Sequence, residues 1–385
     1  MEAKPSLKPV YLLMQGTARR LPIADDSIHC IVLSIPYYQK RLYDVEPEVW
    51  GGHPDCDHDW HPAPKAPFKH SPPSFYCAHC TAWNGRWGNE PTVEQYIINT
   101  VTVAREFYRV LHPSGQLFLN VDDTRHPYDR VWLRVPERLY NALAEDGWRA
   151  EGRVTWHVTN KMPNKGPQFT HTTEMIYQLN KSKKAYFDGE ANRVGGTWNG
   201  RLRNVWSIAN AKTKKKNGRK NSASYPIEIP ITIIKAITSE VGVCPHCLWP
   251  WQRQEEIEVG GLIDRNVKPV HADGFGGMNG AGKTTLGRAV ARTTVGWQPS
   301  CDCPAHDPIP ATVLDPCVGT GMTMEAAATL DRSCVGVDLS RTYLIEEAAP
   351  NLAEILVNPC QPKTQPLYPQ TAVDGQVSLF EGAIS

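Results

Sequence analysis

The sequence predicts an α/β protein built on a mostly parallel sheet, and three observations lead to this fold class. Residues 30–35, CIVLSI, form a short apolar run rich in β-branched side chains, which is typical of a strand buried on both faces. Apolar residues recur at helical spacing between residues 92 and 111, and the strand-like run QLFLNV follows directly. The 385 residues are 41% hydrophobic, which is enough apolar material for a core of enzyme size.

The predicted elements follow one another in a regular order. A strand at residues 10–16 comes first, and the apolar strand ending at Ser34 comes second. A helix begins at Thr92, and the segment HPSG at residues 112–115 ends it near Leu111. The later elements are a strand at 116–121, a helix at about 132–145, strands at about 151–158 and 174–179, a helix near 228–241, a strand at 311–315, a helix at 322–330, a strand at 333–339 and a final helix.

Charge and the distribution of apolar residues exclude several classes of protein. Lys and Arg number 41 against 40 Asp and Glu, so the chain is not a uniformly basic nucleic-acid coat and must hold any polyanion through a local patch. The N-terminus lacks the continuous apolar core of a signal peptide, and no window reaches the roughly 18 apolar residues of a spanning helix. The sequence therefore predicts a cytoplasmic protein with no membrane partner.

The cysteines indicate metal binding, because disulfides are rare in the reducing cytosol and close pairs stand out among the eleven. One predicted site joins two such pairs as four thiolates, a tetrahedral set suited to Zn²⁺. The other is a Cys₃His set, for which His53, His61 and His79 are alternative fourth ligands. Unmetallated thiols packed as small hydrophobes are the alternative for each. The two predicted structural zinc sites are Cys56, His58, Cys77 and Cys80, and Cys244, Cys247, Cys301 and Cys303.

A glycine-rich turn near the C-terminus predicts a nucleoside-cofactor site. The turn, from Asp315 to Gly321, lies between a predicted strand and a predicted helix, where glycines let a ligand approach the backbone at a helix N-terminus. Asp338 ends the next predicted strand, where its carboxylate is placed to accept hydrogen bonds from ribose hydroxyls.

The tetrapeptide Ser34-Ile35-Pro36-Tyr37 at the end of the buried strand gives that turn a more specific meaning. Here the chain resembles the amino-methyltransferases of DNA, whose active-site motif is Asp, Asn or Ser, then Pro-Pro, then Tyr or Phe. Because the tetrapeptide precedes the glycine turn, the motif order resembles the circularly permuted β class. The resemblance implies a Rossmann-like methyltransferase fold. Similar segments cover most of the chain: the turn after Gly16, NEPTVEQY, REFYRVLHPSGQLFLNVDD, NVWSI, ASYPIEIP, VLDPCVGTGMT and GVDL.

The resemblance also implies a role for each motif. The Ser34 hydroxyl and the Pro36 carbonyl are expected to hold the protons of an exocyclic amino group, while Tyr37 stacks on a base flipped from the duplex. Ile35 replaces a family proline and so removes one fixed φ, and Thr17 replaces an acidic residue expected at the cofactor adenine. The implied cofactor is S-adenosyl-L-methionine (SAM). Its expected contacts are Gly16, Thr17, Pro226, Asp315, Pro316, Gly319, Thr320, Gly321 and Asp338.

The predicted function is site-specific methylation of an exocyclic amino nitrogen in double-stranded DNA, as in restriction-modification. Serine at the head of the tetrapeptide resembles the cytosine-N4 subgroup more than the adenine-N6 subgroup, but a serine hydroxyl can serve either base, so both stay open. A non-catalytic zinc DNA-binding protein on a methyltransferase scaffold is the alternative of a different class, motivated by Ile35 and Thr17.

Three other signals compete with this interpretation. Residues 277–284 satisfy phosphate-loop spacing, but the segment before them is no buried strand and GRAVARTT after them is a poor helix start. Cys360, in the sequence Pro-Cys-Gln, resembles the nucleophile motif of cytosine-C5 methyltransferases, yet a predicted helix rather than a strand precedes it. Cys317 belongs to the glycine turn. None of these is expected to carry the chemistry.

The predicted organisation divides the chain into segments. Residues 185–225 lie between the catalytic and cofactor halves and are rich in Gly, Asn and Lys, so they are the expected target-recognition region, with a solvated loop as the alternative. The segments are a catalytic half at 1–43 and 92–184, Cys-rich insertions at 44–91 and 244–306, a SAM-binding half at 226–243 and 307–357, and a flexible tail at 358–385. The residues expected on DNA are Lys212, Lys214, Lys215, Lys216, Arg219 and Lys220.

The tail ends in a peptide that resembles the Gln-x-Ser/Asp-Leu-Phe peptides that bind the bacterial sliding clamp. Leu379 and Phe380 are the expected anchors in an apolar groove, and Gln376 is the expected polar contact. A chance match, or a tail that packs on its own domain, is the alternative.

Overall fold

The computed structural model describes residues 7–69, 71–163, 168–193, 202–211, 215–216, 219–220, 224–263 and 287–357. The clamp-like peptide with Gln376, Leu379 and Phe380, the phosphate-loop match at 277–284, and Cys360 lie outside the described residues. Within the described part of the chain, no helix is both long and apolar enough to cross a bilayer.

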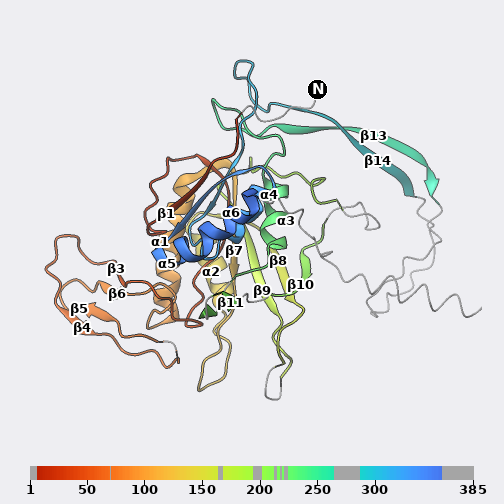
Figure 1. Ribbon diagram of the computed structural model, residues 1–385. Coiled ribbons are helices and arrows are strands. Elements are labelled where there is room, and N and C mark those ends of the chain that lie inside the picture. The colour runs from red at the N-terminus through yellow and green to blue at the C-terminus, as the bar shows by residue number, and fades with distance from the viewer. Residues whose placement is uncertain are drawn as a thin grey trace, which may run out of the picture.

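An eight-stranded sheet forms the centre of the molecule (Figure 1). Seven strands run in one direction, and only β9 is antiparallel to its two neighbours. The predicted α/β fold with a mostly parallel sheet is confirmed. In spatial order the strands are β1 (Tyr11–Gln15), β16 (Ser333–Asp338), β15 (Thr312–Asp315), β2 (Ile28–Ser34), β7 (Leu111–Val121), β9 (Thr173–Asn180), β8 (Arg149–Val158) and β10 (Val205–Ile208).

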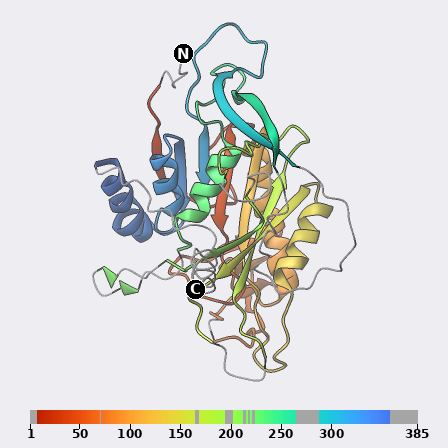
Figure 2. The ribbon, with the colours of Figure 1, turned by 90° about the vertical axis from the view of Figure 1, so that its right-hand side faces the viewer.

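Helices cover both faces of this sheet, which explains the continuous apolar run of β2 (Figure 2). Ile31 and Leu33 pack with the helices of one face, whereas Cys30 and Val32 pack with those of the other, because successive side chains of a strand alternate. The first face carries α1 (Val93–Val110) and α2 (Val135–Glu145). The second carries α3 (Glu228–Ile237), α4 (Met322–Thr329), the short α5 (Arg341–Tyr343), the π-helix η2 (Leu344–Ala348) and α6 (Ala349–Val357).

Several element boundaries differ from those predicted. Helix α1 ends at Val110 as expected, but β7 begins directly at Leu111, and the HPSG segment is a register irregularity within β7. Helix α2 starts at residue 135 rather than 132, because the segment before it forms a loop whose backbone is held by Asp123. Helix α3 ends at residue 237 rather than 241, since Thr238 has an extended backbone.

The segments predicted to lack regular structure contain strands. The first insertion folds as a four-stranded antiparallel sheet in the order β3 (Glu48–Trp50), β6 (Trp83–Gly85), β5 (Phe75–Cys77) and β4 (Trp60–Pro62). The second insertion extends as a long hairpin of β13 (Gln252–Ile263) and β14 (Gly287–Gln298), so GRAVARTT is strand. In the segment 185–225, β10 completes the edge of the main sheet, and β11 (Lys215–Lys216) pairs with β12 (Arg219–Lys220). These strands are stabilised by hydrogen bonds to their partner strands, so the local periodicity of the sequence did not predict them.

Candidate active site and cysteine clusters

The tetrapeptide lies where β2 leaves the middle of the sheet. Ser34, the last residue of β2, is in register with Asn120 of β7, and Asp315 ends the strand on the other side. Because these strands are parallel, their carboxyl ends meet at one edge of the sheet, where α/β proteins bind ligands. We call this the catalytic edge.

The backbone of the tetrapeptide is braced by the segment that precedes α1. Gly88 has φ +90°, and a Cβ there would lie 2.9 Å from the Cβ of Pro36, so this close approach requires glycine. Its carbonyl accepts the N–H of Gln39 at 2.6 Å. The Tyr96 hydroxyl donates to the Pro36 carbonyl at 2.9 Å, which leaves that carbonyl one further lone pair for a substrate.

The ring of Tyr37 is fixed at its hydroxyl. That hydroxyl donates to a carboxylate oxygen of Glu174 at 2.8 Å and accepts the Asn120 side-chain amide at 2.6 Å. Burial raises the pKa of Tyr37 well above its ordinary value, and the negative charge of Glu174 raises it further, although a hydrogen bond with the Ser34 side chain opposes the shift. Tyr37 therefore stays protonated and keeps its ring in one orientation.

Charged side chains surround Glu174 and continue this network. Asp122 accepts His171 Nε2 at 2.9 Å and pairs with Lys40 at 3.1 Å, while Lys161 bridges Asp122 and Glu174 at 3.6 and 3.7 Å. Burial opposes ionisation of Asp122, yet His171 and the two lysines hold its pKa at about 2. Burial, together with the charge of Asp122, raises the pKa of Glu174.

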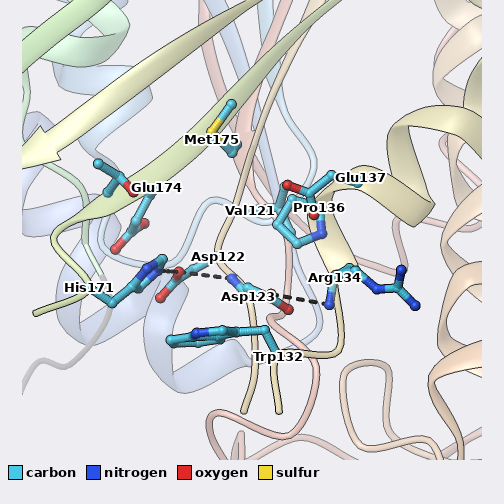
Figure 3. A pocket seen from close by; sticks show the side chains of 11 residues that line it. Val121, Asp122, Asp123, Trp132, Arg134, Pro136, Glu137, His171, Glu174 and Met175 are labelled. Carbon is cyan, nitrogen blue, oxygen red and sulfur yellow. Dashed lines mark hydrogen bonds and ion pairs between the residues drawn. The ribbon is translucent and has the colours of Figure 1, made fainter. Parts of the chain in front are cut away.

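A cavity of about 300 Å³ opens beside these carboxylates. Figure 3 shows His171 hydrogen-bonded to Asp122 above the ring of Trp132, with Glu174 nearby. The mixture of charged, aromatic and apolar lining is typical of a ligand site. The lining residues are Val121, Asp122, Asp123, Trp132, Arg134, Pro136, Glu137, His171, Thr173, Glu174 and Met175.

Asp315 shapes the glycine turn from inside. It is buried, and its carboxylate accepts the Thr323 hydroxyl at 2.5 Å, the Cys317 N–H at 3.1 Å and the Tyr225 hydroxyl at 3.4 Å. Burial raises the pKa of Asp315 to about 7, against the effect of these donors. Gly319 and Gly321 both have positive φ, so the turn that leads into α4 requires glycines. A direct contact of Asp315 with cofactor stays a prediction.

Asp338 reaches the glycine turn from the neighbouring strand. Its carboxylate accepts the N–H of Gly319 at 3.0 Å and the N–H of Ser340 at 2.8 Å, and its carbonyl accepts the Gly16 N–H at 3.0 Å. Burial raises the pKa of Asp338. Two of the roughly four acceptor positions of the carboxylate are used, which leaves the others for hydroxyl donors.

Most of the other residues expected at the cofactor converge on this part of the catalytic edge. Gly16 follows β1, which pairs with β16 beside Asp338, and Thr17 folds back so that its hydroxyl accepts the Arg19 N–H at 3.3 Å. Thr320 is held by the hydroxyl of Ser224 at 2.9 Å, two residues before Pro226. The structure thus places Gly16, Thr320 and Asp338 together, although they are distant in sequence.

The first insertion brings together one of the two predicted metal-ligand sets. The ligand atoms of Cys56, His58, Cys77 and Cys80 all lie within 4.8 Å of one another, which selects His58 among the alternative histidines. The Cys56 and Cys77 sulfurs are 3.8 Å apart, and Cys80 Sγ is 3.4 Å from His58 Nδ1. Tetrahedral zinc places two sulfurs about 3.8 Å apart and a sulfur and a nitrogen about 3.6 Å apart.

The second set, Cys244, Cys247, Cys301 and Cys303, also lies within 4.8 Å, at the opposite edge of the sheet. There the carbonyl oxygens of Cys247 and Leu248 lie 3.2 and 3.0 Å from His112 Nε2 and His29 Nε2, at the start of β7 and β2. This Cys₄ cluster is therefore separated from the catalytic edge by the length of the central strands, as a structural site would be.

The predicted DNA-binding lysines are only partly described. The backbone of Lys215, Lys216, Arg219 and Lys220 forms the β11–β12 pair, while Lys212 and Lys214 lie outside the described residues. Strand β10 runs parallel to β8, so the carboxyl end of β10 lies at the catalytic edge, the same edge as Ser34. The predicted DNA-binding residues follow β10 in the sequence.

Sequence reasoning missed several residues of the site. Tyr96, Asn120, Glu174 and Tyr225 bind the backbone or side chains of predicted residues, yet none belongs to a recognised tetrapeptide or glycine turn. A usable signal existed for Asn120, because it ends a predicted parallel strand, where site residues gather. Tyr96 and Tyr225 lie in the family-like segments NEPTVEQY and ASYPIEIP, but the sequence did not indicate which residues of these segments contact the site.

Comparisons with known proteins agree with this site. The N6/N4 DNA methylase family matches residues 28–244, which is more than half of the chain. The type II methyltransferase M.Cfr9I of Citrobacter freundii is 26% identical over 258 residues, or 59% of this chain and 72% of that protein. M.SmaI of Serratia marcescens is 24% identical over 289 residues, or 67% of this chain and 75% of that protein.

Among solved structures, the fold is similar to that of the PvuII DNA methyltransferase, described as cytosine-N4-specific. The TM-score is 0.52 at 11% identity, and the match covers 92% of this chain and 97% of that one. At this identity the similarity concerns the fold. Together with the tetrapeptide and the glycine turn at one sheet edge, the family match shows that this chain belongs to the N6/N4 DNA methylases and is a SAM-dependent DNA methyltransferase.

Proposed function

We propose that the protein methylates the exocyclic amino nitrogen of a base flipped from duplex DNA, with cytosine N4 as the favoured position and adenine N6 as the alternative. The observation that carries this proposal is the placement of Ser34, Pro36 and Tyr37 at the same sheet edge as the glycine turn and Asp338. This arrangement gives a donor site and an acceptor site on adjacent strands.

The residues of the glycine turn fit SAM by their chemistry. Gly319 and Gly321 have no side chains, so a ligand can approach the backbone at the N-terminus of α4. The Asp338 carboxylate retains acceptor positions suited to ribose hydroxyls. When bound, SAM supplies an electrophilic methyl group on a sulfonium. Gly16, directly after β1, donates its N–H to the backbone carbonyl of Asp338, and Thr17 follows it, where the adenine is expected from the family resemblance.

The tetrapeptide would reshape the amino group for attack. The lone pair of an exocyclic amine is delocalised into the ring, so acceptors that hold its two protons favour the tetrahedral nitrogen of the transition state. The Ser34 hydroxyl and the remaining lone pair of the Pro36 carbonyl are such acceptors, and Tyr96 holds that carbonyl in place. The Tyr37 ring, fixed by Glu174 and Asn120, offers a face for stacking.

The favoured base rests on Ser34, which resembles the cytosine-N4 subgroup. Plasmid DNA from a methylation-deficient host that expresses the protein is expected to contain N4-methylcytosine when digested to nucleosides and analysed by mass. Detection of N6-methyladenine without N4-methylcytosine would show that adenine N6, and not cytosine N4, is the methylated position. If neither base appears and the folded protein also fails to bind SAM in calorimetry, the non-catalytic DNA-binding alternative is the better one.

We also propose one structural Zn²⁺ in each cysteine cluster. The purified protein is expected to contain about two zinc ions per chain, measured by metal analysis, because each set brings four ligand atoms within 4.8 Å of one another and the first set matches tetrahedral spacing. Replacing Cys77 with Ser should remove one zinc and lower the melting temperature by several degrees. A Cys334→Ser variant, at a buried cysteine outside both clusters, is the control and should keep both ions. Two ions in the Cys77→Ser protein would contradict the proposal.

A further inference from the structure

Two connections leave the catalytic edge beside the cavity, and their described parts project beyond the sheet in Figure 1. One, residues 122–134, connects β7 with α2, and the other connects β8 with β9 and is described at residues 159–163 and 168–172. We call them the edge loops. Trp132 of the first and His171 of the second lie together, with ring centroids 4.6 Å apart, so the two loops adjoin over the cavity.

The edge loops carry an unusual concentration of exposed apolar side chains. Phe169 is 100% exposed, Met162 82% and Tyr128 75%, and these are three of the four most exposed large apolar side chains in the described part of the chain. Large apolar side chains exposed on adjoining loops indicate an interaction surface. Met162 follows Lys161, which pairs with Asp122 and Glu174, and Phe169 lies two residues before His171, which binds Asp122.

The first edge loop is an ordered structure. Asp123 accepts the N–H groups of Arg134 and Val135 at 3.1 and 3.0 Å, which closes the base of the loop. Cross-loop hydrogen bonds join His126 N–H to Val131 and Leu133 N–H to Thr124. The exposure of Tyr128 at the tip is therefore imposed by a folded backbone.

Arginine side chains of the first edge loop are available for a ligand. The Arg130 and Arg134 side chains form no ion pair with the described residues, and Arg125 lies over the Trp132 ring at 6.0 Å. In Figure 3 the Arg134 guanidinium extends away from the other labelled side chains. The acids of the first loop are engaged elsewhere: Asp122 with His171 and lysines, Asp123 with backbone N–H groups, and Asp129 with His126.

We propose that the edge loops are the part of the protein that opens the duplex: Tyr128, Met162 and Phe169 enter the base stack at the target, while Arg130 and Arg134 hold the flanking phosphates. Apolar wedges between base steps lower the cost of unstacking, and cations at phosphates give affinity independent of sequence. Duplex DNA is the occupant that matches this pairing of exposed aromatic and cationic side chains with a neighbouring methylation site. The inference rests on the proposed function, since the wedge would serve base flipping.

The wedge can be separated from the chemistry by comparing double-stranded and single-stranded substrates. A Tyr128→Ala, Phe169→Ala variant is expected to methylate a duplex plasmid fragment about 10- to 100-fold more slowly at limiting DNA, but to methylate the same fragment after heat denaturation within about 2-fold of wild type. Phe187→Ala removes an exposed phenylalanine next to Tyr186, whose N–H binds Ser114 far from the catalytic edge, and is the matched control.

The phosphate contacts can be tested by the salt dependence of duplex binding. An Arg130→Ala, Arg134→Ala variant should reduce the magnitude of the negative slope of log K against log salt by about 2. The Arg130→Lys, Arg134→Lys variant should have the wild-type slope. Arg149→Ala, which removes a partly exposed arginine at the start of β8, should leave the slope unchanged. SAM binding measured in every variant verifies the fold.

The outcomes separate the two proposals. If wild type methylates DNA and both edge-loop variants behave like their controls, the inference is wrong and the proposed function stands. Equal losses on duplex and denatured DNA would also overturn the wedge, because they would indicate damage to the catalytic edge. If wild-type protein binds SAM but methylates neither form of DNA, the proposed function itself fails.

Discussion

Replacing Ser34 with alanine is expected to lower kcat for methyl transfer by about 100- to 1000-fold, with SAM affinity within about 2-fold of wild type. In the proposed function the hydroxyl is a preorganised acceptor at the reacting nitrogen, and loss of one such group in a transition state has a cost of this size. The change also removes the hydrogen bond between Ser34 and Tyr37. Transfer of a labelled methyl group from SAM to DNA, together with calorimetry of SAM binding, measures both quantities.

The matched control is Ser27→Ala, just before the opposite end of β2. The Ser27 hydroxyl donates to the Ala24 carbonyl at 2.7 Å, so this variant removes a serine hydroxyl and its hydrogen bond without reaching the catalytic edge. Its kcat should stay near wild type. A Ser34→Ala enzyme that keeps more than a tenth of wild-type kcat would contradict the assigned role, and a parallel loss of SAM affinity would indicate a general disturbance of the fold.

The second large effect is expected from Asp338→Ala, which should weaken SAM binding by about 100-fold. The carboxylate holds the Gly319 N–H and the Ser340 N–H, so its loss disorganises the turn and removes the acceptor proposed for ribose. Hydrogen bonds to a charged group are worth about 1.5 to 3 kcal/mol each, and a 100-fold change corresponds to about 2.7 kcal/mol. Calorimetry with SAM and with S-adenosylhomocysteine measures the change.

Asp331→Asn provides the control for the loss of a carboxylate. Asp331 precedes the other end of β16, is exposed and has φ +56°, a conformation that asparagine tolerates. SAM affinity in this variant should equal that of wild type. If Asp338→Ala binds SAM within about 3-fold of wild type while remaining folded, the assignment of the ribose site to β16 is refuted.

Local sequence patterns were enough to predict a buried strand, the cysteine pairs and the glycine turn. Residues 30–33, directly before Ser34, are all apolar because both faces of their strand are covered, so the burial of this strand could be predicted from the sequence. The cysteine pairs could also be recognised in the sequence, because two thiols a few residues apart are held near each other by the chain itself. The glycine turn was predicted because glycines between a strand and a helix let a ligand approach the backbone, and the positive φ of Gly321 is a conformation that glycine adopts readily.

The tertiary structure decided what local patterns do not encode. Periodicity states which face of a strand is buried, but not which strand becomes its neighbour, because the pairing joins residues far apart in sequence. Only the order β2, β7, β9 brings Asn120 and Glu174 to the Tyr37 hydroxyl, and only the packing of α1 brings Tyr96 to the Pro36 carbonyl. The sequence by itself therefore indicated the tetrapeptide, the glycine turn and the cysteines of both clusters, whereas the structure selected His58 as the fourth ligand. The sheet order determined the side chains that orient the tetrapeptide, since orientation depends on contacts between distant segments.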